Sequence, residues 1–325
     1  MLRFLIIRFS SIGDIVLTTP VVRCLKQQFE NSEIHYVTKR QYVPIIKSNP
    51  YIDKIHVFDK HFNQIVSEIK SEKVDYIIDL HGSLRSRLLR IRLNKPSFVF
   101  PKLNFQKWIM VRLRINLLPQ IHIVDRYMLT LKKFDVDNDG QGLDYFLSES
   151  DQVHLTTLPE EFRQGYIVLA AGAKHNTKQI PQHRMIALCD MLHKPVIILG
   201  GPEDFSKAEE VRRESKTKIL NGCGKFTLNQ SASIVKQSHL VITPDTGIMH
   251  IAAAFQKNIL SLWGNTIPEF GMSPYLPGEK SKIYEIFGLS CRPCSRLGFE
   301  SCPKKHFHCM MDLPVAEIAS LANSL

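Results

Sequence analysis

Two short loops of this sequence combine an aspartate with small residues, in the manner of ligand-binding turns. The first contains Ser10, Ser11, Gly13 and Asp14 and directly follows an apolar run at residues 4–8. Gly13 permits a tight turn, and the serines leave room for a substrate to approach the backbone. Asp14 could act as a general base toward a substrate hydroxyl, or it could cap the following helix, as aspartate often does. Spacing alone favours the cap, and both roles can coexist.

The second loop contains Asp245, Thr246 and Gly247, with His250 one turn later. The amides that open a helix form a ready anion site, so phosphate or diphosphate is the expected guest. His250 could donate to the same anion, or it could be a core histidine beside the alanines at 252–254. Because Asp245 is itself negatively charged, we expect it to bind sugar hydroxyls or to fix the loop, and not to bind the anion. No Walker lysine follows this loop and no GxGxxG follows the first strand, so neither a P-loop nor a nicotinamide site is indicated.

Two further loops carry charged residues where strands are expected to end. The segment AAGAKHNTK at residues 170–178 places Lys174 and Lys178 among small residues, which fits a leaving diphosphate, although lysines are also common on surfaces. Glu203, in GGPED, could accept hydrogen bonds from a ribose diol or could simply favour the start of a helix.

Four cysteines near the C-terminus have the spacing Cys291-x2-Cys294-x7-Cys302-x6-Cys309, with two histidines nearby. A CxxC followed by further cysteine and histidine is compatible with a structural zinc site. The second half lacks a paired CxxC spacing, so reduced thiols in an irregular loop are the favoured interpretation. The remaining three cysteines, Cys24, Cys189 and Cys223, are expected to pack in the core.

These loops are positioned by short apolar strands that alternate with helical patterns, the first helix being expected from Asp14 to about Phe29. We predict strands at residues 4–8, 34–37, 54–57, 76–80, 166–170, 196–199, 218–220, 240–243 and 259–263. Continuous apolar strands alternating with helices indicate an α/β fold with parallel sheets covered on both faces. Ligands bind such sheets at the carboxyl ends of the strands, where the loops above are found.

The strand pattern occurs in two series, separated by a segment at residues 135–150 that is rich in Asp, Gly and Ser and predicts a linker. A chain of 325 residues is also long for one domain. We therefore predict two Rossmann-like domains, residues 1–150 and 151–325, facing one another across a cleft.

The formal net charge of +11 is unevenly distributed. Between residues 81 and 126 the only acid is Asp125, whereas ten residues are basic: Arg85, Arg87, Arg90, Arg92, Lys95, Lys102, Lys107, Arg112, Arg114 and Arg126. Apolar residues interleave with them, which suits an anionic partner such as phospholipid or a phosphorylated glycolipid, with a solvated helix face as the alternative. Nucleic acid is not favoured, because no nucleic-acid-binding motif accompanies the basic residues.

The chain has no run of eighteen apolar residues that could span a membrane. Arg8, Ser10 and Asp14 interrupt the first apolar run before a signal-peptide core could form. We therefore expect a cytoplasmic protein whose seven cysteines are reduced, metal-bound or packed.

Taken together and in order, these loops resemble glycosyltransferase family 9, the ADP-heptose:lipopolysaccharide heptosyltransferases. The resemblance covers nearly the whole chain. Its most specific strings are RFSSIGDIVLTTPVVRCLK at residues 8–26 and ITPDTGIMHIAAAF at 242–255. IDLHGSLRSRLL at 78–89, GAKHNTK at 172–178 and CRPCSRLGFESCPKKHFHCM at 291–310 support them.

The resemblance implies a GT-B architecture, in which residues 1–150 bind the acceptor and residues 151–325 bind the nucleotide sugar. It implies an inverting, metal-independent transfer of heptose from ADP-heptose to a lipopolysaccharide core or related glycolipid, with peripheral contact with the inner membrane. The implied roles are a catalytic base for Asp14, diphosphate binding for Lys178, Thr246, Gly247 and His250, donor-sugar contact for Asp245, and an acceptor side built from Ser10, Ser11, Gly13, His81 and Arg85.

One position departs from the family pattern, because Ile180 stands where relatives usually carry an aromatic residue before a proline. This departure affects the prediction of which nucleotide base and which sugar the donor carries. Two alternatives stay open at this point. One is another GT-B enzyme, such as a nucleotide-sugar epimerase, and the other is a non-enzymatic module that binds anions.

Overall fold

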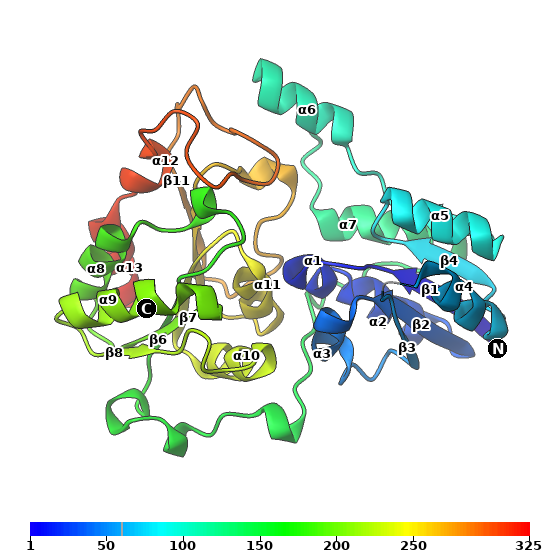
Figure 1. Cartoon of the computed structure of the whole chain (residues 1–325), viewed down its shortest axis with the longest axis horizontal. Helices are drawn as coiled ribbons and strands as arrows, with labels where there is room; N and C mark the ends of the chain where they lie inside the picture. The colour runs from blue at the N-terminus through cyan, green and yellow to red at the C-terminus, as the bar shows by residue number, and fades with distance from the viewer. Residues whose placement is uncertain (60) are drawn as a thin grey trace. The chain divides into compact units, whose positions relative to one another are not determined.

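The computed structural model describes residues 1–59 and 61–325, which form two compact units (Figure 1). Unit 1 comprises Met1–Leu103 and Ile121–Phe146, and unit 2 comprises Asn104–Gln120 and Leu147–Leu325. The predicted division at residue 150 differs from this one chiefly in Asn104–Gln120, which groups with unit 2.

Unit 1 contains a five-stranded parallel sheet of order β3-β2-β1-β4-β5. Its strands are β1 (Leu2–Ile7), β2 (Ser32–Thr38), β3 (Lys54–Val57), β4 (Tyr76–Asp79) and β5 (Ser97–Val99). In the central strand β1, four successive apolar residues from Phe4 to Ile7 are fully buried, so both faces of the sheet are covered.

The helices of unit 1 are α1 (Ile12–Val16), α2 (Thr19–Gln28), α3 (Val43–Ile46), α4 (Phe62–Ser71), α5 (Leu84–Leu93) and α7 (Ile123–Met128). The prediction of one continuous helix from Asp14 to Phe29 was wrong, because the chain breaks between α1 and α2. Pro20 has no N–H to donate to the carbonyl of Val16. The hydroxyl of Thr19 donates to that carbonyl instead, at 2.8 Å.

Much of the segment predicted as a linker at residues 135–150 is part of unit 1. Arg23, buried in α2, donates to the carboxylates of Asp139, at 2.7 and 2.8 Å, and Asp144, and to the carbonyl of Gly142 at 2.9 Å. A polar composition is typical of linkers, but here the acidic residues compensate a buried cation.

Unit 2 contains a six-stranded parallel sheet of order β11-β10-β9-β6-β7-β8. Its strands are β6 (Ile167–Ala170), β7 (Val196–Leu199), β8 (Ile219–Asn221), β9 (Leu240–Pro244), β10 (Ile259–Trp263) and β11 (Lys282–Glu285). Its helices are α6 (Asn104–Leu113), α8 (Gln182–Asp190), α9 (Phe205–Glu214), α10 (Leu228–Gln237), α11 (Gly247–Ala254), α12 (His308–Met311) and α13 (Val315–Ser324).

All nine predicted strands are present to within two residues, and the α/β class with parallel sheets is confirmed. The sequence pattern missed β5 and β11, which are edge strands with partly exposed side chains and no continuous apolar run. Cys24, Cys189 and Cys223 are buried free thiols, as predicted. Within the described residues, no helix combines the length and apolar character needed to cross a membrane.

Candidate functional site

The first predicted loop lies at the carboxyl end of β1, the central strand of unit 1, and Asp14 lies in the first turn of α1. One carboxylate oxygen of Asp14 accepts from the Ser11 hydroxyl at 2.7 Å and from the Ser11 N–H at 3.2 Å. The other oxygen pairs with the guanidinium of Arg8 at 2.5 Å. Asp14 therefore closes the start of the helix through Ser11, and the side chain is a quarter exposed.

Arg8, which sequence reasoning did not include in the site, anchors this turn. Its guanidinium is buried and donates to the carbonyls of Ser10 at 2.7 Å and Leu80 at 2.5 Å, and to the hydroxyl of Tyr127 at 3.0 Å. Burial opposes the charge of Arg8, but Asp14 and the neighbouring tyrosines outweigh it and raise the pKa of this guanidinium. A fixed cation therefore holds the Asp14 carboxylate in place. The available signal was an arginine directly after the apolar run Phe4–Ile7 of β1.

Gly13 lies inside α1, is buried and does not have a positive φ. The expectation that Gly13 supplies a tight turn was therefore wrong, because the backbone there is helical and open to any residue. Ser10 is partly buried and Ser11, the N-cap of α1, is exposed.

His81 lies at the end of the neighbouring strand β4, with its ring edge-on to Phe9 at 5.0 Å. Asp79 shapes this turn by accepting the N–H groups of His81 at 3.0 Å and Gly82 at 2.8 Å. Burial, together with the charges of Arg8 and Lys102, lowers the pKa of His81 to about 3. His81 is therefore a neutral imidazole at physiological pH. Arg85 is exposed in the first turn of α5.

In unit 2 the structure brings together Lys178 and Asp245, which are far apart in sequence. Lys178 ends a short 3-10 helix (Asn176–Lys178) after β6, and Asp245 directly follows the adjacent strand β9. The Lys178 ammonium pairs with Asp245 Oδ2, which also accepts from the Thr266 hydroxyl at 2.9 Å. Both side chains of the ion pair keep some exposure, 17% and 12%.

The same turn leads into α11, whose N-cap is Thr246 and whose first residue is Gly247. Among the described residues, the Thr246 side chain accepts no capping hydrogen bond from the start of α11. Its hydroxyl instead shares a hydrogen bond with the Thr243 hydroxyl at 3.1 Å. The amides at the start of α11, where the anion site is predicted, are therefore not capped by this side chain. His250 is only 2% exposed, which fits the core-histidine alternative.

Glu203 is exposed in a short 3-10 helix (Pro202–Asp204) after β7. Its neighbour Asp204, which sequence reasoning left out, is buried and accepts the Gly201 N–H at 2.9 Å. A Cβ on Gly172 would lie 2.1 Å from the Asp204 carboxylate, and one on Gly200 would lie 2.7 Å away. Both glycines are therefore needed to bring the turns after β6 and β7 against this carboxylate.

The cysteine-rich loop packs against the turn that carries Lys178. The Thr177 N–H and hydroxyl both donate to the carbonyl of Phe299, each at 3.1 Å, and the Phe299 N–H donates back to the hydroxyl at 2.8 Å. Arg292 donates to the carbonyl of Thr266 at 2.8 Å and pairs with Glu285 at 2.6 Å. The loop thus supports both partners of Asp245.

The zinc interpretation of the four cysteines finds no support in the described residues. None of their His, Cys, Asp and Glu side chains form a group of three or more arranged to hold a metal ion. Burial and the neighbouring thiols raise the pKa of Cys294 to about 11 and that of Cys309 to about 12. All four cysteines are free of disulfide bonds.

Two α/β units, each with a parallel sheet and polar turns at the carboxyl ends of its strands, are the architecture of the GT-B fold. The model of glycosyltransferase family 9 (heptosyltransferase) matches residues 63–298, and the chain belongs to this family. The resemblance seen in the sequence is thereby confirmed.

Relatives match over most of the chain. Lipopolysaccharide heptosyltransferase 1 of Campylobacter coli is 24% identical over 296 residues, which are 82% of this chain and 84% of the relative. A solved family 9 glycosyltransferase from Veillonella parvula has a TM-score of 0.72 at 25% identity, covering 86% of this chain and 85% of that one. The fold is also that of E. coli ADP-heptose lps heptosyltransferase II, with a TM-score of 0.76 at 17% identity, covering 99% of this chain and 98% of the other.

Proposed function

We propose that this glycosyltransferase moves heptose from ADP-heptose to a lipopolysaccharide core or a related glycolipid acceptor, with inversion and without a metal ion. The observation that carries the proposal is the juxtaposition of Lys178, Asp245 and the start of α11 in a member of family 9. A nucleoside diphosphate sugar carries an anion next to hydroxyl groups, and this arrangement offers a cation and amides next to a carboxylate.

In the proposed donor site, the diphosphate lies at the Lys178 ammonium and at the amides near Thr246 and Gly247. Asp245 accepts hydrogen bonds from donor-sugar hydroxyls, so one donor molecule engages both members of the ion pair. In this proposal the buried His250, one turn into α11, donates to the same diphosphate, and Glu203 binds the ribose diol.

In the proposed reaction, the acceptor hydroxyl attacks the anomeric carbon as its proton passes to Asp14, and the bond to ADP breaks. Arg8 and Ser11 fix the orientation of the Asp14 carboxylate. The charge that develops on the leaving diphosphate is stabilised by Lys178 and the α11 amides, where one preorganised donor contributes about 3–4 kcal/mol in measured cases. Transfer requires the Asp14 turn and the donor to approach one another.

On the acceptor side, Ser10, Ser11, Gly13, His81 and Arg85 line the approach to Asp14. Arg85 is exposed and cationic and suits a phosphorylated acceptor, whereas neutral His81 suits hydroxyl groups. A glycolipid acceptor places the enzyme at the cytoplasmic face of the inner membrane through peripheral contact.

The test is product analysis with ADP-heptose in the presence and absence of a heptose-free lipopolysaccharide core. We expect a heptosylated acceptor with inverted anomeric configuration, formed in the presence of a chelator. A changed nucleotide sugar without acceptor would instead indicate an epimerase, and binding without turnover would indicate an anion-binding module. Thermal shifts with ADP-, UDP- and GDP-sugars then identify the donor base.

A further inference from the structure

Helix α6 and the loop that follows β11 share a surface within unit 2 that the proposed transfer reaction does not use. Both ends of α6 contact this loop. At the start of α6, the Arg296 guanidinium donates to Asn104 Oδ1 at 3.4 Å. Just after α6, Arg114 donates to the carbonyls of Ser290 at 3.1 Å, Cys291 at 3.1 Å and Pro293. The helix therefore lies along the loop as one structural piece.

This surface exposes large apolar side chains. Phe105 is 69% exposed and Trp108 50%, and their rings stack with centroids 6.3 Å apart. Leu113 at the end of α6 is 56% exposed, and Leu297 in the loop is 67% exposed. Scattered single apolar residues need no explanation, but a patch that includes two stacked aromatics marks an interaction site.

The same surface is strongly cationic. Asn104–Gln120 contains Lys107, Arg112 and Arg114 and no acidic residue. Residues 286–305 expose Arg296, Lys304 and Lys305 with only Glu300 as an acid, whereas the side chain of Arg292 is largely buried in its pair with Glu285. A second copy of the chain would bring these cations face to face in a two-fold contact, which like charges oppose. An anionic bilayer satisfies both features, because lipid headgroups take the cations and the aromatic rings enter the interface.

We propose that Phe105, Trp108, Arg112 and Leu113 of α6, together with Arg296 and Leu297, form a docking surface for a bilayer of anionic phospholipid. We name it the α6 surface. The proposal deepens the proposed function and rests on it for the lipid nature of the acceptor. Docking raises the local concentration of a membrane-held acceptor without contributing to the chemistry.

Tryptophan fluorescence of the full chain tests the proposal, because the chain has two tryptophans and Trp263 is fully buried. Vesicles of phosphatidylcholine with about one-third phosphatidylglycerol, a share chosen to give about 1 kcal/mol of attraction per basic residue, should shift the Trp108 emission to the blue. Pure phosphatidylcholine should not, and Trp108→Phe should abolish the shift. Absence of a shift with the anionic vesicles overturns the proposal.

Vesicle sedimentation then ranks the contributions. The double variant Phe105→Ser with Trp108→Ser should bind at least about ten-fold more weakly, and Arg112→Gln about five-fold more weakly. Matched controls are Met191→Ser and Arg213→Gln, exposed residues of the same types elsewhere in unit 2, and they should bind like the wild type. The proposal is overturned if the double variant binds vesicles as tightly as the wild type. It is also overturned if the wild type is a dimer and the double variant is a monomer.

Transfer onto a delipidated, water-soluble core separates this proposal from the proposed function. The double variant should keep the wild-type rate on that acceptor and lose rate on acceptor in anionic vesicles. A wild type that binds vesicles but transfers heptose to neither acceptor would contradict the proposed function and leave docking supported. Equal loss on both acceptors would contradict docking.

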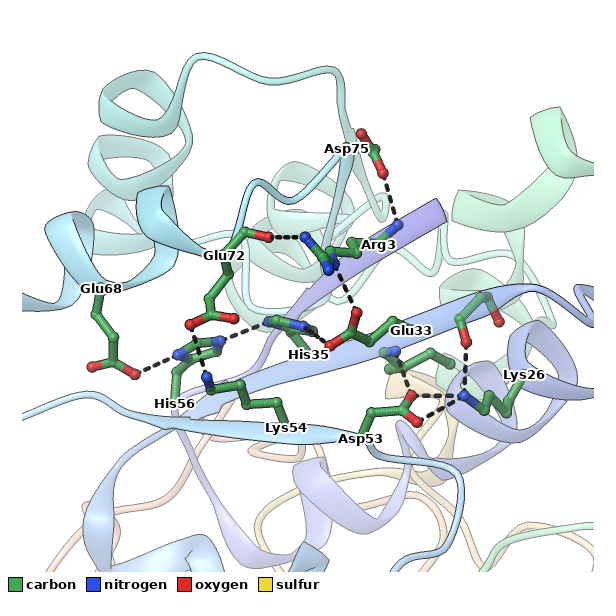
Figure 2. Close-up of polar contacts among 12 residues, drawn as sticks. Arg3, Lys26, Glu33, His35, Asp53, Lys54, His56, Glu68, Glu72 and Asp75 are labelled. Atoms are coloured by element: carbon green, nitrogen blue, oxygen red, sulfur yellow. Dashed lines mark hydrogen bonds and ion pairs between the residues drawn. The ribbon is translucent and has the colours of Figure 1, made fainter. Parts of the chain in front are cut away.

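A separate observation in unit 1 carries a second inference. Figure 2 shows a chain of hydrogen-bonded side chains that crosses from β2 to β3 and α4. Glu33 lies 3.0 Å from His35 Nε2, His35 Nδ1 lies 2.9 Å from His56 Nε2, and His56 Nδ1 lies 2.5 Å from Glu68. Both imidazoles are fully buried, so these three contacts use all four of their ring nitrogens.

Counting protons shows that this chain needs one more than two neutral imidazoles supply. If each carboxylate accepts a hydrogen bond, His35 donates from Nε2 and His56 from Nδ1. The two remaining nitrogens then face one another as lone pairs at 2.9 Å, unless a third proton lies between them. We infer that the closed arrangement binds one extra proton, and that losing it as pH rises loosens β3 and α4 from β2.

The surrounding charges set the environment of this proton. From β1, Arg3 pairs with Glu33 at 2.7 Å and holds the pKa of that carboxyl below its usual range, together with His35. From β3, Lys54 pairs at 2.7 Å with Glu72, which follows α4. Burial lowers the pKa of His56, which favours loss of the extra proton as pH rises.

Hydrogen exchange of the β3 amides between pH 5.5 and 8, corrected for intrinsic rates, tests this inference. We expect the protection factor of these amides in the wild type to fall at least about ten-fold as pH rises. The loss of a single proton limits this fall to about ten-fold per pH unit. In Glu68→Gln the new amide can donate to His56, which lets two neutral imidazoles complete the chain, so protection should stay constant. A pH-independent wild type, or the same slope in Glu68→Gln, overturns the inference. Histidine ¹⁵N shifts of the wild type test it without mutation, because one shared imidazolium proton should disappear across this range.

Discussion

In both units an aspartate in the segment that follows a parallel strand pairs with a cation, but the two pairs are built differently. In unit 1, Arg8 comes from the same turn as Asp14 and is buried among two carbonyls and a tyrosine hydroxyl. In unit 2, Lys178 comes from the turn after the neighbouring strand β6, and among the described residues its ammonium pairs with Asp245 alone.

The difference in surroundings indicates a difference in role. The multiple bonds of Arg8 hold it in one place, so it can orient Asp14 but cannot leave it for a ligand. The Lys178 ammonium has a flexible stem and a single partner, so a diphosphate can compete for it. We therefore treat the Arg8–Asp14 pair as a rigid support for a base and the Lys178–Asp245 pair as an exchangeable ligand site.

The largest effect is expected for Asp14→Asn. Losing the base should lower the rate of heptose transfer by about 10²–10⁴-fold, while ADP affinity stays at the wild-type value because the change is confined to unit 1. Single-turnover transfer and calorimetric ADP binding measure the two quantities. Ser11→Ala is the matched control, since it removes a contact and keeps the carboxylate. A normal transfer rate in Asp14→Asn would leave Asp14 with only its structural role.

The next effect concerns stability. Arg8→Met removes a buried cation, leaves its carbonyl and hydroxyl acceptors without their donor and leaves Asp14 without its charge partner. We therefore expect the free energy of unfolding of unit 1 to fall by about 3 kcal/mol. Lys178→Met removes one partner of a more exposed pair and should cost about 1 kcal/mol. Urea unfolding followed by a probe in each unit measures both changes. Similar losses in the two variants would remove the contrast between a rigid and an exchangeable pair.

A third prediction addresses the exchangeable pair directly. Lys178→Ala should weaken ADP binding by about 10–100-fold, the range for a hydrogen bond to a charged group of about 1.5–3 kcal/mol. Lys174→Ala, an exposed lysine of the same loop, is the control and should change little. Unchanged affinity in Lys178→Ala, measured by calorimetry, would exclude this lysine from the donor site.

The smallest effect is a pH dependence at the turn of unit 1. The pKa of His81 is lowered to about 3 in the folded chain, mainly by burial, against about 6.5 when unfolded. Below pH 6.5 the unfolded chain therefore binds a proton that the folded chain does not. The stability that neutral His81 contributes is lost as pH falls toward 3, by less than about 1.4 kcal/mol per pH unit. The stability gap between wild type and His81→Gln should narrow from pH 7 to pH 5. A gap that stays constant would show that His81 titrates normally.

Sequence reasoning located the strands other than β5 and β11, both loops and the family, because buried parallel strands are continuous apolar runs and the family strings are long. It missed Arg8 as part of the site, since a charged residue after a strand is usually solvated. It did not single out Asp204, because the packing of Gly172 and Gly200 against this buried carboxylate cannot be read from the sequence. It also expected one helix where Pro20 and Thr19 produce two.

The sequence by itself determined which turns carry polar residues at the carboxyl ends of two parallel sheets, because apolar periodicity and local turn chemistry are properties of neighbouring residues. Only the tertiary structure decided what those residues meet. Arg8 bonds Leu80 and Tyr127 across separations of 72 and 119 residues, and Lys178 meets Asp245 across 67. The order of strands in each sheet brings these partners together, and that order follows from packing the whole chain.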